Sequence, residues 1–160
     1  MARDHFIAPT APTEDAVAVR LGAGSGSSNN LTQVEVGKFA KLAGESRYNL
    51  AAVGNEIEAV ITAVEIAPQN GFTIGAVQTE GTFNVTFDGL QATPGTGTIA
   101  IGDYVVTGTP VAKDTALTAP PKVCKATAAA TGLVFKWRVV SLGTAGTGAV
   151  GTTGVIQFVS

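Results

Sequence analysis

Side chains that most often carry catalysis are scarce in this 160-residue chain, which has one histidine, His5, and one cysteine, Cys124. A nucleophilic pair would need the histidine held within hydrogen-bond reach of a hydroxyl or thiol. His5 lies in an N-terminal stretch without a regular hydrophobic period, so we interpret it as a surface residue. Cys124 has no partner for an internal disulfide and is predicted to be a small apolar core residue.

Two glutamates could imitate the carboxylate pair of a glycosidase. Glu56 and Glu58 flank Ile57 and would project from the same face of a strand, about 7 Å apart. Such a role needs a concave pocket and a strongly perturbed carboxylate. A solvated or interface edge is the simpler interpretation of the two glutamates, and a small β-barrel hydrolase is kept as a rival hypothesis.

Signatures of nucleotide and metal binding are incomplete. Residues 146–151 (GTGAVG) match G-x-G-x-x-G, but the dinucleotide motif needs a helix next and an acidic residue about 20 positions later, and residues 152–160 contain no acidic side chain. Lys38 follows Gly37, but Phe39 stands where a phosphate loop has Ser or Thr. One histidine and one cysteine cannot supply four zinc ligands. The sequence therefore predicts a protein that is not an enzyme and that binds neither a cofactor nor a metal.

Composition restricts the partners. Only 14% of residues are charged and the net charge is −2, so no basic stripe predicts direct nucleic-acid binding. No apolar run approaches the roughly 18 residues of a membrane-spanning helix. The N-terminus has charges at once and no apolar region typical of a cleaved secretion signal, which favours synthesis in the cytoplasm.

The elements that would position any site are predicted to be strands. Residues 56–66 and 72–77 are rich in β-formers and flank Asn70-Gly71, the strongest short-range signal for a hairpin. In residues 33–53, the alternation of Val34 and Val36 favours a strand followed by a loop.

Later segments continue the pattern at the spacing of a sandwich or barrel. Phe83, Val85 and Phe87 alternate with polar residues, which is typical of a half-buried strand. Near the C-terminus, LVFKWRVVS places Phe135, Trp137 and Val139 on one face. Strands are expected over residues 82–87, 97–101, 104–108, 122–127, 133–141 and 154–159.

The first 30 residues are predicted to form an extended arm and a Gly/Ser loop, ahead of a single β domain over residues 31–160. Prolines favour extended backbone, and the GAGSGSS run is costly to order. An arm with apolar residues but no core of its own suggests partner contact, and packing on the chain's own barrel is the alternative. The candidate partner-binding residues are Phe6, Ile7, Pro9, Pro12, Val17, Val19 and Leu21.

Three phrases of the sequence together resemble a known family. The block GKFAKLAGESRYNLAAVGNEIEAVI, the later GDYVVTGTP and the ending WRVVSLGTAGTGAVGTTGVIQFV are similar to tailed-bacteriophage capsid decoration proteins, also called cement or head-stabilising proteins. The resemblance implies a jelly-roll or tulip-like β-sandwich or barrel with an extended N-terminal arm. It implies a structural protein of the virion, made in the bacterial host cytoplasm, that clamps neighbouring major capsid protein subunits on the outer surface of the head. No cofactor or catalytic residue comes with it.

Clamps of this kind gain avidity from several weak contacts and usually have closed symmetry, so a homotrimer is favoured over a dimer. The alternative function is a carbohydrate-binding or adhesion module. It would present exposed aromatic side chains for stacking on sugars, and an exposed Trp137 would favour it over the capsid hypothesis.

Overall fold

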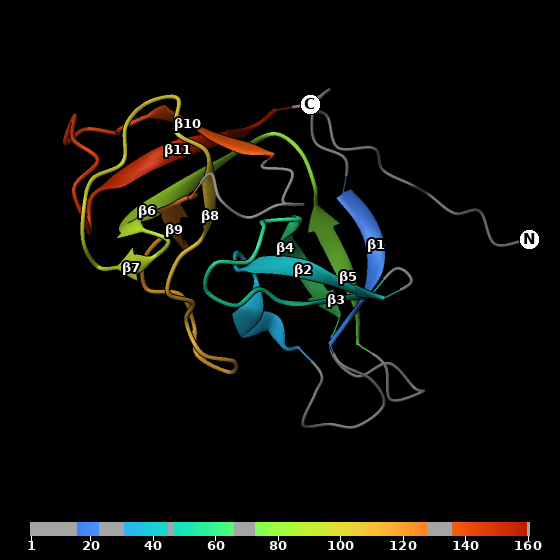
Figure 1. Cartoon of the computed structure of the whole chain (residues 1–160). Coiled ribbons are helices and arrows are strands. Elements are labelled where there is room, and N and C mark those ends of the chain that lie inside the picture. The colour runs from blue at the N-terminus through green and yellow to red at the C-terminus, as the bar shows by residue number, and fades with distance from the viewer. Residues whose placement is uncertain (1–15, 23–30, 45–46, 66–72, 128–135, 160) are drawn as a thin grey trace, which may run out of the picture.

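The computed structural model describes residues 16–22, 31–44, 47–65, 73–127 and 136–159 (Figure 1). Within these ranges the chain is an all-β protein with eleven strands in two sheets and one short 3-10 helix. The predicted all-β sandwich or barrel class is confirmed.

The first five strands close into a small barrel, which we call the barrel half. Their order around the barrel is β1-β3-β2-β4-β5, and every neighbouring pair is antiparallel except β1 with β3. The antiparallel pairing of β4 with β5 confirms the predicted hairpin, whose turn lies outside the described residues. The elements are β1 (Ala16–Leu21), the 3-10 helix η1 (Gln33–Glu35), β2 (Phe39–Gly44), β3 (Arg47–Leu50), β4 (Ala59–Glu65) and β5 (Thr73–Gln78).

The remaining strands form a second sheet, the sheet half, in the order β10-β11-β6-β9-β8, with β7 paired to β6. Strand β11 lies between β10 and β6 and pairs with both, so the C-terminal strand is an interior strand of the sheet, as predicted. The strands are β6 (Thr82–Leu90), β7 (Thr93–Pro94), β8 (Val105–Thr107), β9 (Lys122–Lys125), β10 (Trp137–Ser141) and β11 (Thr153–Phe158).

Both outer strands of the second sheet have covered edges. Thr107 in β8 exchanges two backbone hydrogen bonds of 2.8 and 2.9 Å with Gly54 and Asn55 of the barrel half. The backbone of Val139 in β10 makes two bonds of the same lengths with the loop before β8. Exposed edges are templates for adding a foreign strand. The described body therefore offers little free edge for a partner's strand at these positions.

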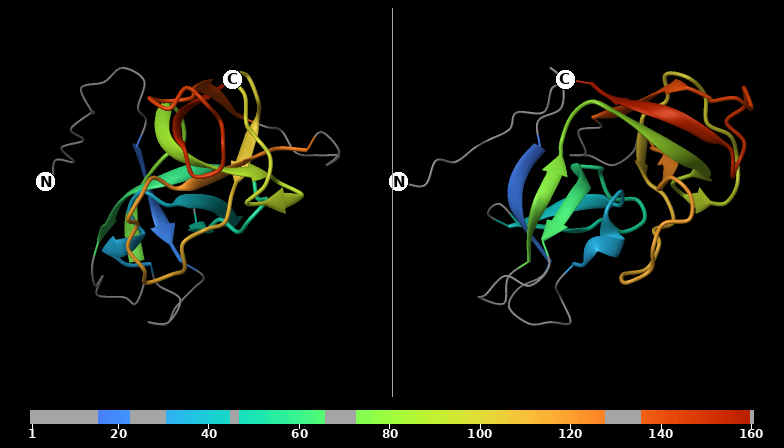
Figure 2. Two further views of the ribbon diagram at one scale, coloured as in Figure 1. Left: turned by 90° about the vertical axis from the view of Figure 1, so that its left-hand side faces the viewer. Right: turned by 180° about the vertical axis from the view of Figure 1, so that it is seen from behind.

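Trp137 joins the two halves. Its side chain is 1% exposed, its indole N–H donates to the carbonyl of Ile57 at 2.7 Å, and its ring packs against Phe83 and Phe158. Val139 is buried beside it, which confirms the predicted inward face of this strand. The two halves lie against each other in both views of Figure 2 and share one core cluster, to which the barrel half contributes Phe39, Ala51, Ile57 and Val60.

The prediction for residues 33–53 was wrong in detail. Instead of a strand at Val34 and Val36, the chain forms η1, and the predicted loop contains the paired strands β2 and β3. The Glu35 side chain accepts a hydrogen bond from the Thr32 backbone N–H, which stabilises the short helix, and Gly37 then turns the chain at φ +88°.

Residues 97–101 also depart from the predicted strand. Only Thr98 makes a bridge, to Ala149, and Gly97 lies at φ +87°, which interrupts extended backbone. Ile99 is nevertheless buried, so the apolar signal that suggested a strand reflects core packing of a loop.

Candidate functional site

The predicted partner-binding residues fall into two groups. Phe6, Ile7, Pro9 and Pro12 lie outside the described residues, as does the side chain of Val17. Val19 and Leu21 are buried in the barrel core, because β1 pairs with both β3 and β5. For these two residues the alternative holds: they pack on the chain's own barrel. The predicted division at residue 30 therefore cuts through the barrel.

The candidate carboxylate pair does not share one groove. Glu58 accepts a hydrogen bond from the backbone N–H of Leu42 and lines a groove of about 290 Å³ together with Tyr48 and Glu80. Burial, with the nearby charge of Glu58, raises the pKa of the Tyr48 phenol. Glu56 is not among the residues that line this groove. The arrangement does not bring the two candidate carboxylates together on a substrate.

Other chemistry considered from the sequence finds no built site in the described residues. Cys124 is fully buried, as predicted, and burial with the nearby Asp88 carboxylate raises the pKa of its thiol to about 11. The GTGAVG glycines lie in the connection between β10 and β11, and a strand rather than a helix follows them. Across the described ranges no three His, Cys, Asp or Glu side chains cluster as metal ligands, and no helix has the length and apolar character needed to cross a membrane.

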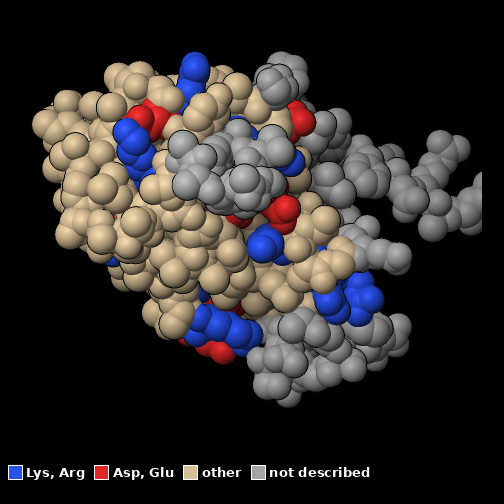
Figure 3. Space-filling view, viewed as in Figure 1, with Lys and Arg blue, Asp and Glu red and all other residues tan. Residues whose placement is uncertain are grey.

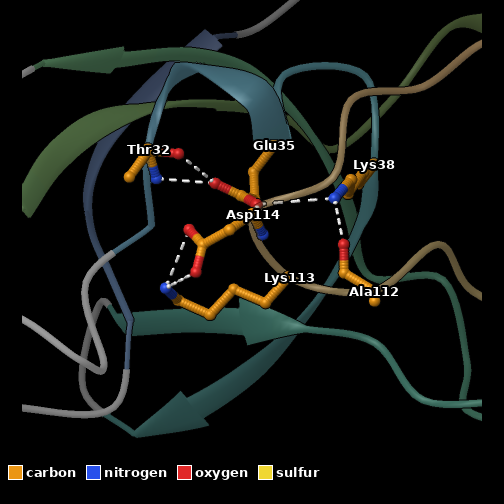
Figure 4. Close-up of polar contacts among 6 residues, drawn as sticks. All are labelled: Thr32, Glu35, Lys38, Ala112, Lys113 and Asp114. Carbon is orange, nitrogen blue, oxygen red and sulfur yellow. Dashed lines mark hydrogen bonds and ion pairs between the residues drawn. The ribbon is translucent and has the colours of Figure 1, made fainter.

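A buried ion pair ties the barrel half to the long loop between β8 and β9, residues 108–121 (Figure 4). Glu35 is 0% exposed and Lys38 is 4% exposed, and their Oε1 and Nζ atoms lie 3.4 Å apart. Glu35 also accepts hydrogen bonds from the Thr32 hydroxyl at 2.8 Å and from the Asp114 backbone N–H at 2.6 Å. Lys38 Nζ donates to the carbonyl of Ala112 at 2.8 Å. Both buried charges are thus satisfied, as such groups must be in a stable interior.

Electrostatics of this network favour a charged glutamate. Burial alone would raise the pKa of Glu35, but the hydrogen bonds from Thr32 and Asp114 and the attraction of Lys38 lower it overall. Asp114 has a left-handed backbone, with φ +62°, in the loop that the network holds. Sequence reasoning missed this network, although Thr32-x-x-Glu35 has the spacing of a capping box and was its one local signal. We interpret the network as structural, because it holds the 108–121 loop against the barrel half.

Beside the ion pair lies an apolar cavity of about 120 Å³ between the two halves and the 108–121 loop. Its volume suits a single aliphatic side chain and is below the roughly 300 Å³ at which small-molecule sites begin. The Thr107 hydroxyl at its wall is buried and has no hydrogen-bond partner among the described residues. The lining includes Phe39, Leu50, Ala51, Pro110, Val111, Leu117, Pro120 and Pro121.

The surface most distinct in chemistry is one without charges. Residues 91–102 and 143–153 contain no Asp, Glu, Lys or Arg, and most of them are exposed. The two segments are neighbours, since Thr98 pairs with Ala149 and the Ile99 N–H donates to the Gly148 carbonyl at 2.9 Å. We call this surface the charge-free end; it occupies the left-hand side of Figure 3.

The loops of the charge-free end are held by hydrogen bonds and tight glycines. The Thr96 hydroxyl donates to the Thr93 carbonyl at 2.8 Å, and the Thr152 hydroxyl donates to the Ala149 carbonyl at 2.7 Å. A Cβ on Gly148 would lie 1.7 Å from the Ile99 carbonyl oxygen, so only glycine allows this close approach. The end is therefore a pre-organised surface built from small neutral side chains.

Comparison with known proteins adds no relative: no protein-family model, curated protein or solved structure matches the chain.

Proposed function

We propose that this chain is a structural capsid decoration protein, which binds the outer surface of a bacteriophage head and stabilises contacts between major capsid protein subunits. The observation that carries the proposal is the charge-free end, an exposed surface without charged residues whose loops are held by hydrogen bonds, on an all-β body. Cores of protein interfaces are depleted in charged residues, because burying a charge without a partner is costly. The resemblance of three sequence segments to decoration proteins suggests that the partner is a major capsid protein.

The placement of this end suits a clamp. The charge-free end and β1 lie at opposite ends of the molecule in Figure 1 and in the right-hand view of Figure 2. Residues 1–15, with the candidate contacts Phe6 and Ile7, precede β1 in the chain. A protein that touches its partners through two separate regions gains avidity, since attachment of one region raises the effective concentration of the other.

An exposed Trp137 would have favoured the carbohydrate-binding alternative, and the structure does not expose it. Trp137 is buried and its indole N–H is already bonded to Ile57, so it offers no face for stacking on a sugar. Tyr104 is 42% exposed. A sugar platform normally uses more than one flat aromatic side chain, and the described surface supports the capsid proposal better.

Co-sedimentation with expanded, undecorated phage heads and with unexpanded heads tests the proposal. The full chain is compared with a variant lacking residues 1–14, which keeps β1 in the barrel; removal through residue 30 would take away a core strand and confuse unfolding with loss of contact. We expect saturable binding to expanded heads that weakens when residues 1–14 are removed. Absence of binding of the folded full chain to either form would overturn the proposal, and glycan screening would then come first.

A further inference from the structure

We propose that residues 110–119, the middle of the loop between β8 and β9, form a lid over the apolar cavity, and that the lid opens while the rest of the chain stays folded. The ion pair of Glu35 with Lys38 is the latch that keeps the lid closed. The inference does not rest on the capsid function, because it concerns a motion of the chain by itself. It is carried by where the loop is bonded to the body, by what lies beneath it and by the backbone of Asp114.

Both ends of the loop are fastened to the sheet half. At the first end, the Thr109 N–H donates to the Asp88 carboxylate at 2.7 Å. At the second end, the Thr86 hydroxyl donates to the Pro120 carbonyl at 2.9 Å. The loop is therefore anchored on either side of the lid, and a motion that keeps these anchors moves only the residues between them.

The latch provides every hydrogen bond that joins the lid to the barrel half among the described residues. Glu35 accepts from the Asp114 N–H at 2.6 Å, and Lys38 Nζ donates to the Ala112 carbonyl at 2.8 Å. The other hydrogen bonds of the lid join its own residues to one another. No residue of the lid is buried, so opening takes little apolar surface of the lid out of the core. Segments with few buried contacts open at a lower free energy than the core does.

Three features beneath and within the lid favour opening. The cavity of about 120 Å³ leaves lid atoms without packing partners. The buried Thr107 hydroxyl at the cavity wall has no hydrogen-bond partner among the described residues, and an open lid lets water reach it. Asp114 has φ +62°, a left-handed backbone that is unfavourable for a residue with a Cβ, and opening releases it. The latch must outweigh all three to keep the lid closed.

The charge of Glu35 is what makes the latch strong. While Glu35 is ionised, the Lys38 ammonium has a counter-charge at 3.4 Å, although this lysine is only 4% exposed. A neutral side chain at position 35 leaves the ammonium buried without a counter-charge, which is strongly unfavourable. Lifting the lid relieves this state, because water then reaches the ammonium. Loss of the Glu35 charge therefore shifts the lid towards its open position.

Acid is one way to remove this charge. Burial by itself raises the pKa of Glu35, but its hydrogen bonds and the nearby ammonium lower it overall, so the carboxyl stays charged until the pH falls below the ordinary value of 4.5. Among the described residues only Lys38 forms an ion pair with Glu35. The other charged groups on the elements packed against Glu35 are Lys113 and Asp114 of the lid, which pair with each other, the exposed Glu65 of β4 and the exposed Lys41 of β2.

Limited trypsin digestion at neutral pH tests the latch, because trypsin cleaves after lysine and Lys113 lies in the lid. Glu35→Gln removes the charge and keeps the size of the side chain. We expect cleavage at Lys113 to become about tenfold faster while the chain remains folded by circular dichroism. Lys41 is the internal reference, because cleavage within the paired strand β2 needs wider unfolding. Glu58→Gln is the matched control and should behave like wild type, since the hydrogen bond of Glu58 with the Leu42 N–H lies within the barrel half.

Hydrogen exchange of the wild-type chain tests the lid without any substitution, so the outcome does not depend on whether Glu35→Gln folds. The Asp114 amide should exchange at least about 100-fold faster than the Phe87 amide, which donates to the Thr152 carbonyl within the sheet half. Dilute urea should leave the Asp114 rate unchanged, because a local opening exposes little surface.

Two results would overturn the inference. The first is an Asp114 amide that exchanges as slowly as that of Phe87 and with the same dependence on urea, because the lid would then open only when the whole chain unfolds. The second is a folded Glu35→Gln chain that trypsin cleaves at Lys113 no faster than wild type or Glu58→Gln, because the ion pair would then not be the latch.

Discussion

The junction between the two halves and the charge-free end use charge in opposite ways. At the junction Glu35 and Lys38 are buried, and each is matched by a counter-charge and hydrogen bonds; Asp88, buried within the sheet half, is likewise matched by Lys122 and the Thr109 backbone N–H. The charge-free end has no charged residue and exposes small neutral side chains. Buried charges therefore fix how the barrel half fits against the 108–121 loop, whereas the exposed neutral loops can change without leaving a buried charge unpaired.

A buried charge is sensitive to the loss of its partner, whereas an exposed neutral site is insensitive to most changes in the monomer. Substitutions at the junction should therefore change the free energy of unfolding strongly. Substitutions at the charge-free end should weaken the proposed binding to phage heads and leave the free energy of unfolding almost unchanged.

Replacing Trp137 at the junction should have the largest effect. Trp137→Ala leaves a cavity between the halves and removes the donor to the Ile57 carbonyl, so we expect a loss of about 3–5 kcal/mol in the free energy of unfolding. Trp137→Phe keeps much of the volume but not the hydrogen bond and should cost about 1–3 kcal/mol. Urea unfolding followed by circular dichroism measures both. A loss below about 1 kcal/mol for Trp137→Ala would mean that the indole does not hold the halves together.

Removing one member of the buried ion pair comes next. Glu35→Ala leaves the Lys38 ammonium buried without its counter-charge and should cost about 3 kcal/mol. The double variant Glu35→Leu/Lys38→Met removes both charges and should be much closer to wild type. Lys113→Ala breaks the exposed pair with Asp114 and serves as the control, with an expected change of at most about 1 kcal/mol. Equal losses from Glu35→Ala and Lys113→Ala would contradict the assignment of the buried network.

Acid should weaken the fold through two buried carboxylates, Glu35 at the junction and Asp88 within the sheet half. For both Glu35 and Asp88, burial alone would raise the pKa, but hydrogen bonds and neighbouring lysines lower it overall. A carboxyl whose folded pKa lies below its unfolded value stabilises the fold above the unfolded pKa, and this contribution is lost as pH falls through the folded pKa. The unfolded values are 4.5 and 3.8, so the melting temperature should fall as pH drops below about 4.

Glu35→Gln is the variant that isolates one of these groups, because the amide does not titrate in this range. The variant should be less stable than wild type at neutral pH and should show a shallower decrease of melting temperature in acid. Thermal unfolding over the acid range measures the slope. A variant with the wild-type slope would show that Glu35 is not among the groups whose protonation destabilises the fold.

Local patterns predicted much of the fold. Asn70-Gly71 between two β-rich runs marked the β4–β5 hairpin, and the alternation around Trp137 marked a strand with an inward aromatic face. Both signals depend on residues close in sequence. The alternation of Val19 and Leu21 was visible too, but it does not say which strand β1 pairs with, and so a barrel strand was interpreted as part of an arm.

The site depended on contacts that no local pattern encodes. The hydrogen bond from the Asp114 N–H to Glu35 joins residues 79 apart in sequence, so the capping spacing of Thr32 and Glu35 could not indicate that the glutamate also holds a distant loop. The two uncharged stretches of the charge-free end are legible in the sequence. Their union into one surface requires the pairing of Thr98 with Ala149.

Charge insertion at the charge-free end should have the smallest effect on stability. Thr98 and Thr144 are exposed, so Thr98→Lys/Thr144→Lys should change the free energy of unfolding of the monomer by no more than about 0.5 kcal/mol. Urea unfolding measures this value, with Thr62→Lys, at an exposed threonine of β4, as the matched control on the barrel half. A loss comparable to that of Glu35→Ala would show that these loops are needed for folding. Neutral residues would then have been retained there for stability, and the separation between a junction that fixes the fold and an end that makes contact would no longer hold.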